Sequence, residues 1–245
     1  VASRSGRHGP NIEGSNAHVV RRLEHRYRLH VTRRLDARDT SPFVPDFVHP
    51  LAALGRVAVG QTLAVDVTGA FVHGPGRYAF ALRSASTDKA SYGARESVTA
   101  AERPVLRLEF GEAAATTTTT TTTASTTSST APASIVVLAP VADTYVVAGT
   151  EGSWDHGACP TVKTDRSPAS LVYLKFDLGA AAGRVARAWL ELSCTNASAD
   201  GGTVYPVDDA SWVEGDRCAG GGAGLTWSAV DCNRDGVVDA RDAGP

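Results

Sequence analysis

Apolar and polar residues alternate along many short segments of this 245-residue chain, or form short apolar runs. Turn formers such as Gly74-Pro75-Gly76 separate these segments, and helical spacing does not extend beyond about two turns. The pattern predicts an all-β fold of antiparallel strands, in a sandwich or a barrel, with one face of each strand in a core. The expected strands lie at 63–67, 78–82, 106–110, 135–138, 145–147, 171–178, 188–192 and 204–207.

A threonine-rich segment divides this pattern in two. Residues 116–123 are eight consecutive threonines, and a Ser/Thr/Ala/Pro stretch follows them up to Ser134. So polar a segment cannot bury enough surface to offset its ordering entropy, and such tracts are typical of extracellular, often O-glycosylated stalks. We interpret 111–134 as a linker between 35–110 and 135–245, and we expect a secreted or cell-surface protein.

The N-terminal residues 1–34 contain eight arginines and four histidines but only two glutamates. A nucleic-acid-binding arm is one interpretation of this charge. Neither helical nor strand periodicity is present, and the composition also fits a misread frame of GC-rich DNA, so we expect disorder and no nucleic-acid partner. No run of eighteen apolar residues exists, so no membrane span is predicted.

Residues 35–42 and 238–245 repeat the sequence pattern [LV]-Asp-Ala-Arg-Asp-x-x-Pro. The repeat suggests that 35–110 continues the domain that 135–245 begins. Either half alone would leave sheet edges unpaired and its core open to water. We therefore predict that the two halves pair as one circularly permuted sandwich, with Ala64–Thr68 or Tyr78–Leu82 sharing a sheet or a core with strands beyond Ser134.

A set of motifs resembles the DNRLRE domain family, in permuted order. The first half of the family is matched by Ala142-Asp-Thr-Tyr-Val146, by 174–178, by 188–192, by Ser211-Trp-Val-Glu214 and by Thr226-Trp227. The second half is matched by 66–68, 77–82, Arg95-Glu96 and 103–106, with Ala94 where the family usually has serine. The resemblance implies a jelly-roll β-sandwich of secreted and surface proteins, often a carbohydrate-binding module attached to polysaccharide-degrading enzymes, with Trp212 and Trp227 in its core.

A twelve-residue loop at 231–242 has the composition of a calcium site. Calcium prefers six to eight hard oxygen ligands, which such a loop supplies from positions 1, 3, 5, 7, 9 and 12, with glycine at position 6. Gly236 occupies that turn position, and aspartate at position 12 gives the loop a dockerin-like character. The expected ligands are Asp231, Asn233, Asp235, the Val237 carbonyl, Asp239 and Asp242. The alternative is a solvated acidic loop.

The cysteines, Cys159, Cys194, Cys218 and Cys232, all follow the linker and form no Cys-x-x-Cys pair. An oxidising compartment favours two disulfides over a zinc site. Three connectivities are open, and four free thiols are the alternative. We prefer Cys218 with Cys232, beside the calcium loop, which leaves Cys159 with Cys194.

No catalytic constellation is recognisable, so the chain is predicted not to be an enzyme. Strand alternation directs Ala188, Leu190 and Leu192 to the core and Trp189 outward, and by the same argument directs Tyr173 and Lys175 outward. An outward Trp and Tyr near lysines would suit sugar stacking and contact with an acidic sugar. The candidate carbohydrate-binding residues are Trp189, Tyr173, Lys175, Lys163 and the loop residue Trp154.

Two functions remain open. The first is an extracellular polysaccharide-binding accessory module with structural calcium, carried by a larger multidomain chain. The second is a structural or adhesive surface repeat without glycan binding, in which Trp189 packs under a loop or against the linked half of the chain.

Overall fold

The computed structural model describes residues 40–71, 74–111, 134–179 and 184–243, all within one compact unit. The expectations for 1–34 and for most of the 111–134 linker lie outside the described residues. No helix in the described part of the chain combines the length and the apolar character that a membrane crossing requires.

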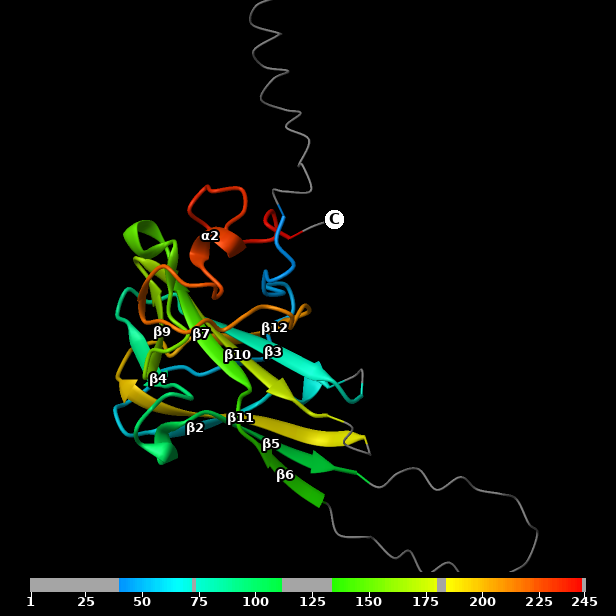
Figure 1. The fold of residues 1–245 in the computed structure, drawn as a ribbon. Coiled ribbons are helices and arrows are strands. Elements are labelled where there is room, and N and C mark those ends of the chain that lie inside the picture. The colour runs from blue at the N-terminus through cyan, green and yellow to red at the C-terminus, as the bar shows by residue number, and fades with distance from the viewer. Residues whose placement is uncertain (1–39, 72–73, 112–133, 180–183, 244–245) are drawn as a thin grey trace, which may run out of the picture. The chain divides into compact units, whose positions relative to one another are not determined.

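The described residues form mainly antiparallel strands (Figure 1). In chain order the strands are β1 (Ala52–Ala53), β2 (Thr62–Asp66), β3 (Arg77–Arg83), β4 (Ala90–Gly93), β5 (Val105–Phe110), β6 (Ser134–Leu138), β7 (Ala142–Val147), β8 (Trp154–Asp155), β9 (Thr161–Arg166), β10 (Ala169–Asp177), β11 (Val185–Asn196), β12 (Thr203–Val207) and β13 (Ala219–Gly220). The short helical turns are η1 (Thr68–Ala70), η2 (Ala100–Glu102), η3 (Gly149–Glu151) and α2 (Trp227–Val230).

Eleven of the described strands make two layers of one curled sheet, and β8 and β13 form a separate two-stranded sheet. The first layer has the order β1-β12-β3-β10-β7, and in the second β11 lies between β2 and β5, with β6 beyond β5. Strands β4 and β9 connect the layers, because β4 pairs with β11 and β9 pairs with both β4 and β10. The expected all-β, jelly-roll-type antiparallel β-sandwich is therefore confirmed.

The main core lies between the two layers. Leu174 and Phe176 of β10 and Phe80 of β3 enter it from the first layer, and Leu190 and Leu192 of β11 enter it from the second. Each of these side chains is almost completely buried. The period-two alternation of the sequence thus predicted the inward face of these strands correctly.

Strands from both sides of the threonine-rich segment pair with each other. β10 pairs with β3 over seven registered residue pairs, from Leu171 opposite Arg83 to Asp177 opposite Arg77. On the second layer, β11 is flanked by β2 and β5. The predicted association of the two halves is confirmed by this pairing, because neither layer is complete without strands from both.

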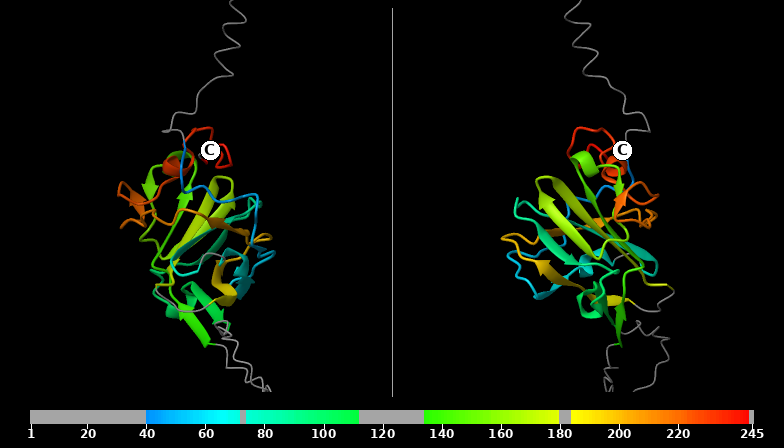
Figure 2. Two further views of the ribbon diagram at one scale, coloured as in Figure 1. Left: turned by 90° about the vertical axis from the view of Figure 1, so that its right-hand side faces the viewer. Right: turned by 60° about the vertical axis from the view of Figure 1, so that its left-hand side comes forward.

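The outer face of the first layer is covered by the C-terminal part of the chain. A second core forms there, in which Trp212, Trp227 and Val238 pack on Ala81 of β3 and Tyr173 of β10. Residues 40–50 lie at the same end of the unit as the segment around α2 (Figure 2). This second core has no counterpart on the outer face of β11, where Trp189 and Glu191 remain partly exposed.

The two connecting strands were not predicted from the sequence. All four residues of β4 are buried, so they show no alternation, and β9 is short and carries several polar residues. The pairing of β4 and β9 depends on how the sheet curves from one layer to the other. This curvature is a tertiary property, which the local pattern of apolar and polar residues does not indicate.

Candidate functional site

Trp154 is an exposed aromatic side chain on an ordered loop. It belongs to the two-residue strand β8, which pairs with β13, and its indole packs next to Gly220. The side chain of the neighbouring Asp155 is fully buried and orders this region. Its carboxylate accepts hydrogen bonds from the backbone amides of Gly157 at 2.9 Å, Asp216 at 3.1 Å and Gly224 at 3.3 Å. Three chain segments are thereby held around Trp154, which is 38% exposed.

His156 lies beside Trp154 and connects it through Tyr145 and Glu151 to Lys163. The His156 ring stacks on Tyr145, with centroids 4.1 Å apart, and its centroid is 6.3 Å from that of Trp154. Glu151 lies 3.4 Å from Nε2 of His156 and 3.7 Å from Nζ of Lys163. We call Trp154, His156, Lys163, Glu151 and Tyr145 the Trp154 cluster. Two of the predicted sugar-binding residues, Trp154 and Lys163, are therefore brought together.

Burial controls the protonation of this cluster. It lowers the pKa of His156, an effect that Glu151 opposes and Lys163 reinforces. It also raises the pKa of Tyr145 to about 12, so this phenol stays protonated near neutral pH. The neutral form of His156 is thus favoured; among the described residues its Nδ1 has no hydrogen-bond partner, and its Nε2 has only the long 3.4 Å contact with Glu151. Sequence reasoning assigned no partner to His156, because its neighbours come from three separate segments.

The predicted disulfide pairing is wrong. Cys159 pairs with Cys218, 59 residues away, and the bond joins the start of β9 to the segment that precedes β13. Cys194 lies buried in the main core on β11, opposite Tyr92 of β4, and is a free thiol. The Sγ atom of Cys232 lies 3.4 Å from the carbonyl oxygen of Ala229. The disulfide thus cross-links the segments next to the Trp154 cluster and not the acidic loop.

The prediction that Tyr173 and Lys175 face the solvent is also wrong. Both point away from the main core, as the alternation requires, but the C-terminal segment covers them. Tyr173 is fully buried and its hydroxyl donates to the Phe43 carbonyl at 3.1 Å. Lys175 donates to the Trp212 carbonyl, and its ammonium lies 4.2 Å from the centroid of the Trp212 ring. Burial lowers the pKa of Lys175 and raises that of Tyr173.

Trp189 lies on the second layer, with Asp66 of β2 and Arg107 of β5 as its cross-strand neighbours. Its outward direction agrees with the sequence prediction, and it is half-buried. It cannot share a surface with Tyr173, because the two side chains occupy the outer faces of different layers. The five predicted residues therefore do not form one sheet face.

The loop 231–242 is compact and follows its predicted turn. Gly236 has a φ of +86°, in the region that glycine tolerates best. Asp242 is fully buried, and its carboxylate accepts the amides of Asn233 at 3.2 Å and Asp239 at 3.0 Å. Burial raises the pKa of Asp242, and the nearby Asp231 adds to this effect. The predicted ligands thus fold around one loop.

One carboxylate oxygen in this loop lacks a partner. Asp231 is 4% exposed; its Oδ2 accepts hydrogen bonds from Gly236 and from the Trp227 indole, each at 3.0 Å. Its Oδ1 is buried without a hydrogen-bond partner among the described residues. The guanidinium of Arg241 lies 2.9 Å from Asp235 and 2.7 Å from Asp239. The loop thus offers hard oxygen donors, one of them buried and unpaired, which is the kind of ligand that calcium prefers.

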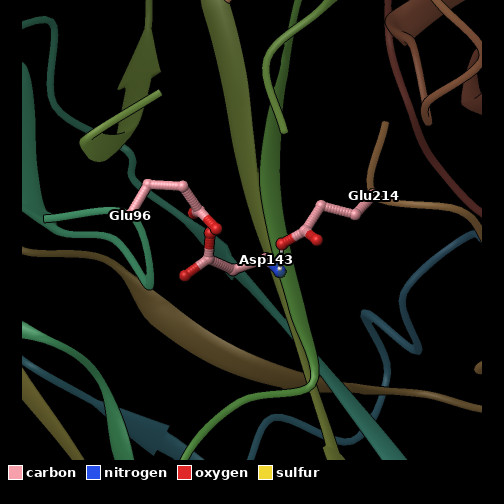
Figure 3. Close-up of side chains that lie close together, drawn as sticks. All are labelled: Glu96, Asp143 and Glu214. Carbon is pink, nitrogen blue, oxygen red and sulfur yellow. Dashed lines mark hydrogen bonds between the residues drawn. The ribbon is translucent and has the colours of Figure 1, made fainter. Parts of the chain in front are cut away.

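A second acidic cluster, drawn in Figure 3, combines Glu96, Asp143 and Glu214. One oxygen from each lies within 4.8 Å of the others. Glu214 accepts the Asp143 amide at 2.7 Å and the Arg95 guanidinium at 2.6 Å, while Asp143 accepts the Arg95 amide at 2.6 Å. Asp143 is 1% exposed, and burial raises its pKa to about 8, with Glu96 and Glu214 adding to the rise.

This cluster joins motifs from both sides of the threonine-rich segment. Arg95 and Glu96 come from the first part of the chain, and Asp143 and Glu214 from the second. Convergent carboxyls with a raised pKa are a feature of many acid–base catalysts. Here the protonated Asp143 is enclosed, and the hydrogen bonds of Arg95 and Glu214 fasten a loop to β7. We therefore assign the cluster a structural task. Sequence reasoning had marked these residues only as parts of family motifs.

Comparison with known proteins gives one match. No curated protein and no solved structure matches the chain. The model of carbohydrate-binding module family 96 matches residues 134–217, a stretch that covers less than half of the chain. The matched residues include Trp154, His156, Lys163 and Cys159, and they are similar to a carbohydrate-binding module; Cys218, the disulfide partner of Cys159, lies one residue beyond the match.

Proposed function

We propose that the protein is a non-catalytic, extracellular carbohydrate-binding module of DNRLRE type, and that the Trp154 cluster contacts the sugar. The match to a carbohydrate-binding module family over 134–217 is the observation that carries this proposal. Trp154 supports it, because an exposed indole held on an ordered loop can stack on the apolar face of a sugar ring. We further propose that the module belongs to a larger secreted or cell-surface chain.

The charges of the Trp154 cluster favour sugar hydroxyls. Lys163 is paired with Glu151, which leaves the surface without a strong excess of positive charge. Glu151 accepts hydrogen bonds and Lys163 donates them, so together they can bind the hydroxyl groups of a sugar stacked on Trp154. Asp155 and the disulfide preorganise the loop, which reduces the entropy lost on binding.

A glycan array with neutral and acidic polysaccharides, followed by calorimetric titration, tests this function. Trp154→Ala should weaken binding by roughly five- to tenfold, as loss of an aromatic contact worth about 1 to 1.4 kcal/mol implies. Trp189→Ala is the matched control, since it removes a half-buried indole from the other layer, and should leave affinity unchanged. Full binding by Trp154→Ala would contradict the site, and absence of binding to any glycan would favour the structural-repeat function.

We also propose that 231–242 holds a structural calcium ion. Asp231, Asn233, Asp235, Asp239, Asp242 and the Val237 carbonyl would hold it, and bound calcium would supply the positive charge that this acidic loop needs. Arg241 would then release Asp235 and Asp239. Because Asp231 also binds Trp227, a residue of the second core, an ordered loop would stabilise the covering segment.

Thermal unfolding with calcium or with a chelator tests this site. Calcium at about one hundred times its dissociation constant adds about 2.7 kcal/mol, which raises the Tm by roughly 5 to 10 °C. Asp231→Asn should abolish the shift, and Asp216→Asn, at an exposed acid outside the loop, should retain it. A shift that survives Asp231→Asn but disappears in Glu96→Gln would place the ion at the carboxylate cluster and contradict the loop.

A further inference from the structure

A groove of about 500 Å³ lies between the first layer of the sheet and the C-terminal segment that packs on its outer face. Its floor is formed by the ends of β3, β9 and β10 and by β12, and residues 236–238 of the acidic loop line it as well. The volume is within the usual range for small-ligand sites. The residues used below are Arg83, Arg166, Ser170, Tyr205, Trp227 and Val237.

Two arginines at this groove form no close ion pair, although the charge of Arg83 also acts on Asp239 of the acidic loop. Among the residues that the structure describes, neither Arg83 nor Arg166 forms an ion pair. Arg83 stacks its guanidinium 4.7 Å above the centroid of the Phe47 ring, which fixes its plane without satisfying its donors. Because a guanidinium presents paired N–H groups that match an oxyanion, these two side chains favour an anionic ligand.

Two acidic residues, Asp165 and Asp200, also line the groove. Asp165 accepts a hydrogen bond from the Ser167 amide at 3.1 Å, and Asp200 is engaged more fully. The Asp200 carboxylate accepts hydrogen bonds from the Ala85 amide at 2.8 Å, the Ser84 hydroxyl at 3.1 Å and the Gly202 amide at 3.0 Å. These bonds order the rim of the groove and leave the carboxylate with few free acceptor positions. Asp200 therefore weakens the positive potential but does not neutralise either arginine through contact.

An unsatisfied hydroxyl gives a second, independent indication. Ser170 at the start of β10 lines the groove and is 1% exposed, and its Oγ has no hydrogen-bond partner in the described part of the chain. A buried hydroxyl without a partner costs free energy, and such groups are few in folded proteins. A bound ligand could supply the missing partner.

The acidic loop supplies one wall of the groove. Asp231 holds this wall, since one of its oxygens binds both the Trp227 indole and the Gly236 amide. Trp227, Gly236 and Val237 all line the groove. An ion bound by Asp231 would therefore act on the same carboxylate that positions the wall.

We propose that this groove is a second ligand site, which binds a sugar carrying a carboxylate or sulfate group through Arg83 and Arg166, and that loading of the acidic loop strengthens this binding. The coupling rests on the calcium site proposed above, whereas the groove itself does not. Tyr205 offers an aromatic surface beside the two cations. The groove thus complements the Trp154 cluster, whose lysine is already paired.

Calorimetric titration with matched oligosaccharides tests the groove. The probes are an oligogalacturonide, its fully methyl-esterified form and a sulfated galactan oligosaccharide. The oligogalacturonide or the sulfated probe should bind, and the methyl ester should bind the groove at least tenfold more weakly. The probe that binds shows whether the groove recognises a carboxylate or a sulfate group. Equal affinity for the acid and its ester would overturn the proposal.

Variants separate the groove from the Trp154 cluster. Arg166→Gln and Arg83→Gln should each weaken anionic binding about fivefold or more, while Arg187→Gln, at an exposed position on β11, should not. Arg166 is exposed, so its replacement should fold normally even if Arg83→Gln, which loses its contact with Phe47, does not. If anionic binding is lost in Trp154→Ala and kept in Arg166→Gln, the groove proposal fails while the carbohydrate-binding function stands.

Chelation and Asp231→Asn test the coupling in the same titration. Both should weaken anionic binding several-fold, and Asp216→Asn should not. If anionic affinity is unchanged by chelator while thermal unfolding still responds to calcium, the coupling is wrong and the calcium site remains. Anionic binding that is unchanged in both arginine variants would exclude the groove, regardless of the effect of calcium.

Discussion

The backbone amide of Ser41 donates a hydrogen bond to the carbonyl oxygen of Asp242, across 2.7 Å. Ser41 belongs to one copy of the internal repeat, 35–42, and Asp242 belongs to the other, 238–245. The two copies of the repeat are thereby brought next to each other in one fold. Such a contact is what the predicted circular permutation would require.

We predict that cutting the chain in its threonine-rich segment leaves the two halves associated. A protease site placed within 116–123 should yield two fragments that co-elute in gel filtration, because β10 pairs with β3 and β11 is flanked by β2 and β5. The fragments should separate only in denaturant, with the cut protein less stable than the intact chain because the connection no longer limits the unfolded state. Two fragments that separate in native buffer would refute the joint sandwich.

Asp143→Asn should change the pH dependence of stability. Asp143 has a folded pKa of about 8 against an ordinary value of 3.8, so the folded state keeps a proton that the unfolded chain releases between these values. Its contribution to stability is fully present below pH 3.8 and is lost as the pH rises to about 8. Asparagine can donate to Glu96 and accept from Arg95 as the protonated acid does.

The stability of Asp143→Asn relative to wild type should therefore rise from pH 5 to pH 8 in chemical unfolding. The control is Asp88→Asn, at an exposed turn position, which should follow wild type throughout. Parallel pH profiles for wild type and Asp143→Asn would show that Asp143 is ionised in the folded protein.

Removal of the Cys159–Cys218 disulfide should destabilise the module by roughly 2 to 4 kcal/mol, since it closes a long loop. Paired Cys159→Ala and Cys218→Ala changes, measured by urea unfolding, test this. Cys194→Ala is the matched control: it should not mimic the loss of a cross-link, and its cost should reflect only a small buried cavity. Glycan affinity should also fall in the disulfide variant, because the bond staples the Trp154 cluster.

Asp155→Ala should cost about 1 to 3 kcal/mol, because it leaves the buried amide of Gly157 and the more accessible amides of Asp216 and Gly224 without their acceptor. Asp88→Ala, at an exposed turn position, should change stability by less than about 0.5 kcal/mol. Near-wild-type urea unfolding of Asp155→Ala would show that water replaces the carboxylate and that the loop is not ordered by it.

Strand positions and inward faces were predictable from the sequence, because the alternation of Leu190 and Leu192 with Trp189 and Glu191 is a local property of an extended chain. The association of the two halves was also predictable, since each half exposes edges that only the other can pair. The sequence identified Lys163 and Trp154 as candidate sugar-binding residues. It did not predict that His156 and Glu151 connect them.

Whether an outward face meets water was decided only by the tertiary structure. Tyr173 and Trp189 follow the same alternation, yet the first is covered by Trp212 and the second is not. The same limit applies to the cysteine pairing and to the meeting of Glu96, Asp143 and Glu214. Periodicity reports which side of a strand a residue occupies, whereas burial, disulfides and carboxylate clusters depend on contacts between segments far apart in the chain, which local pattern does not encode.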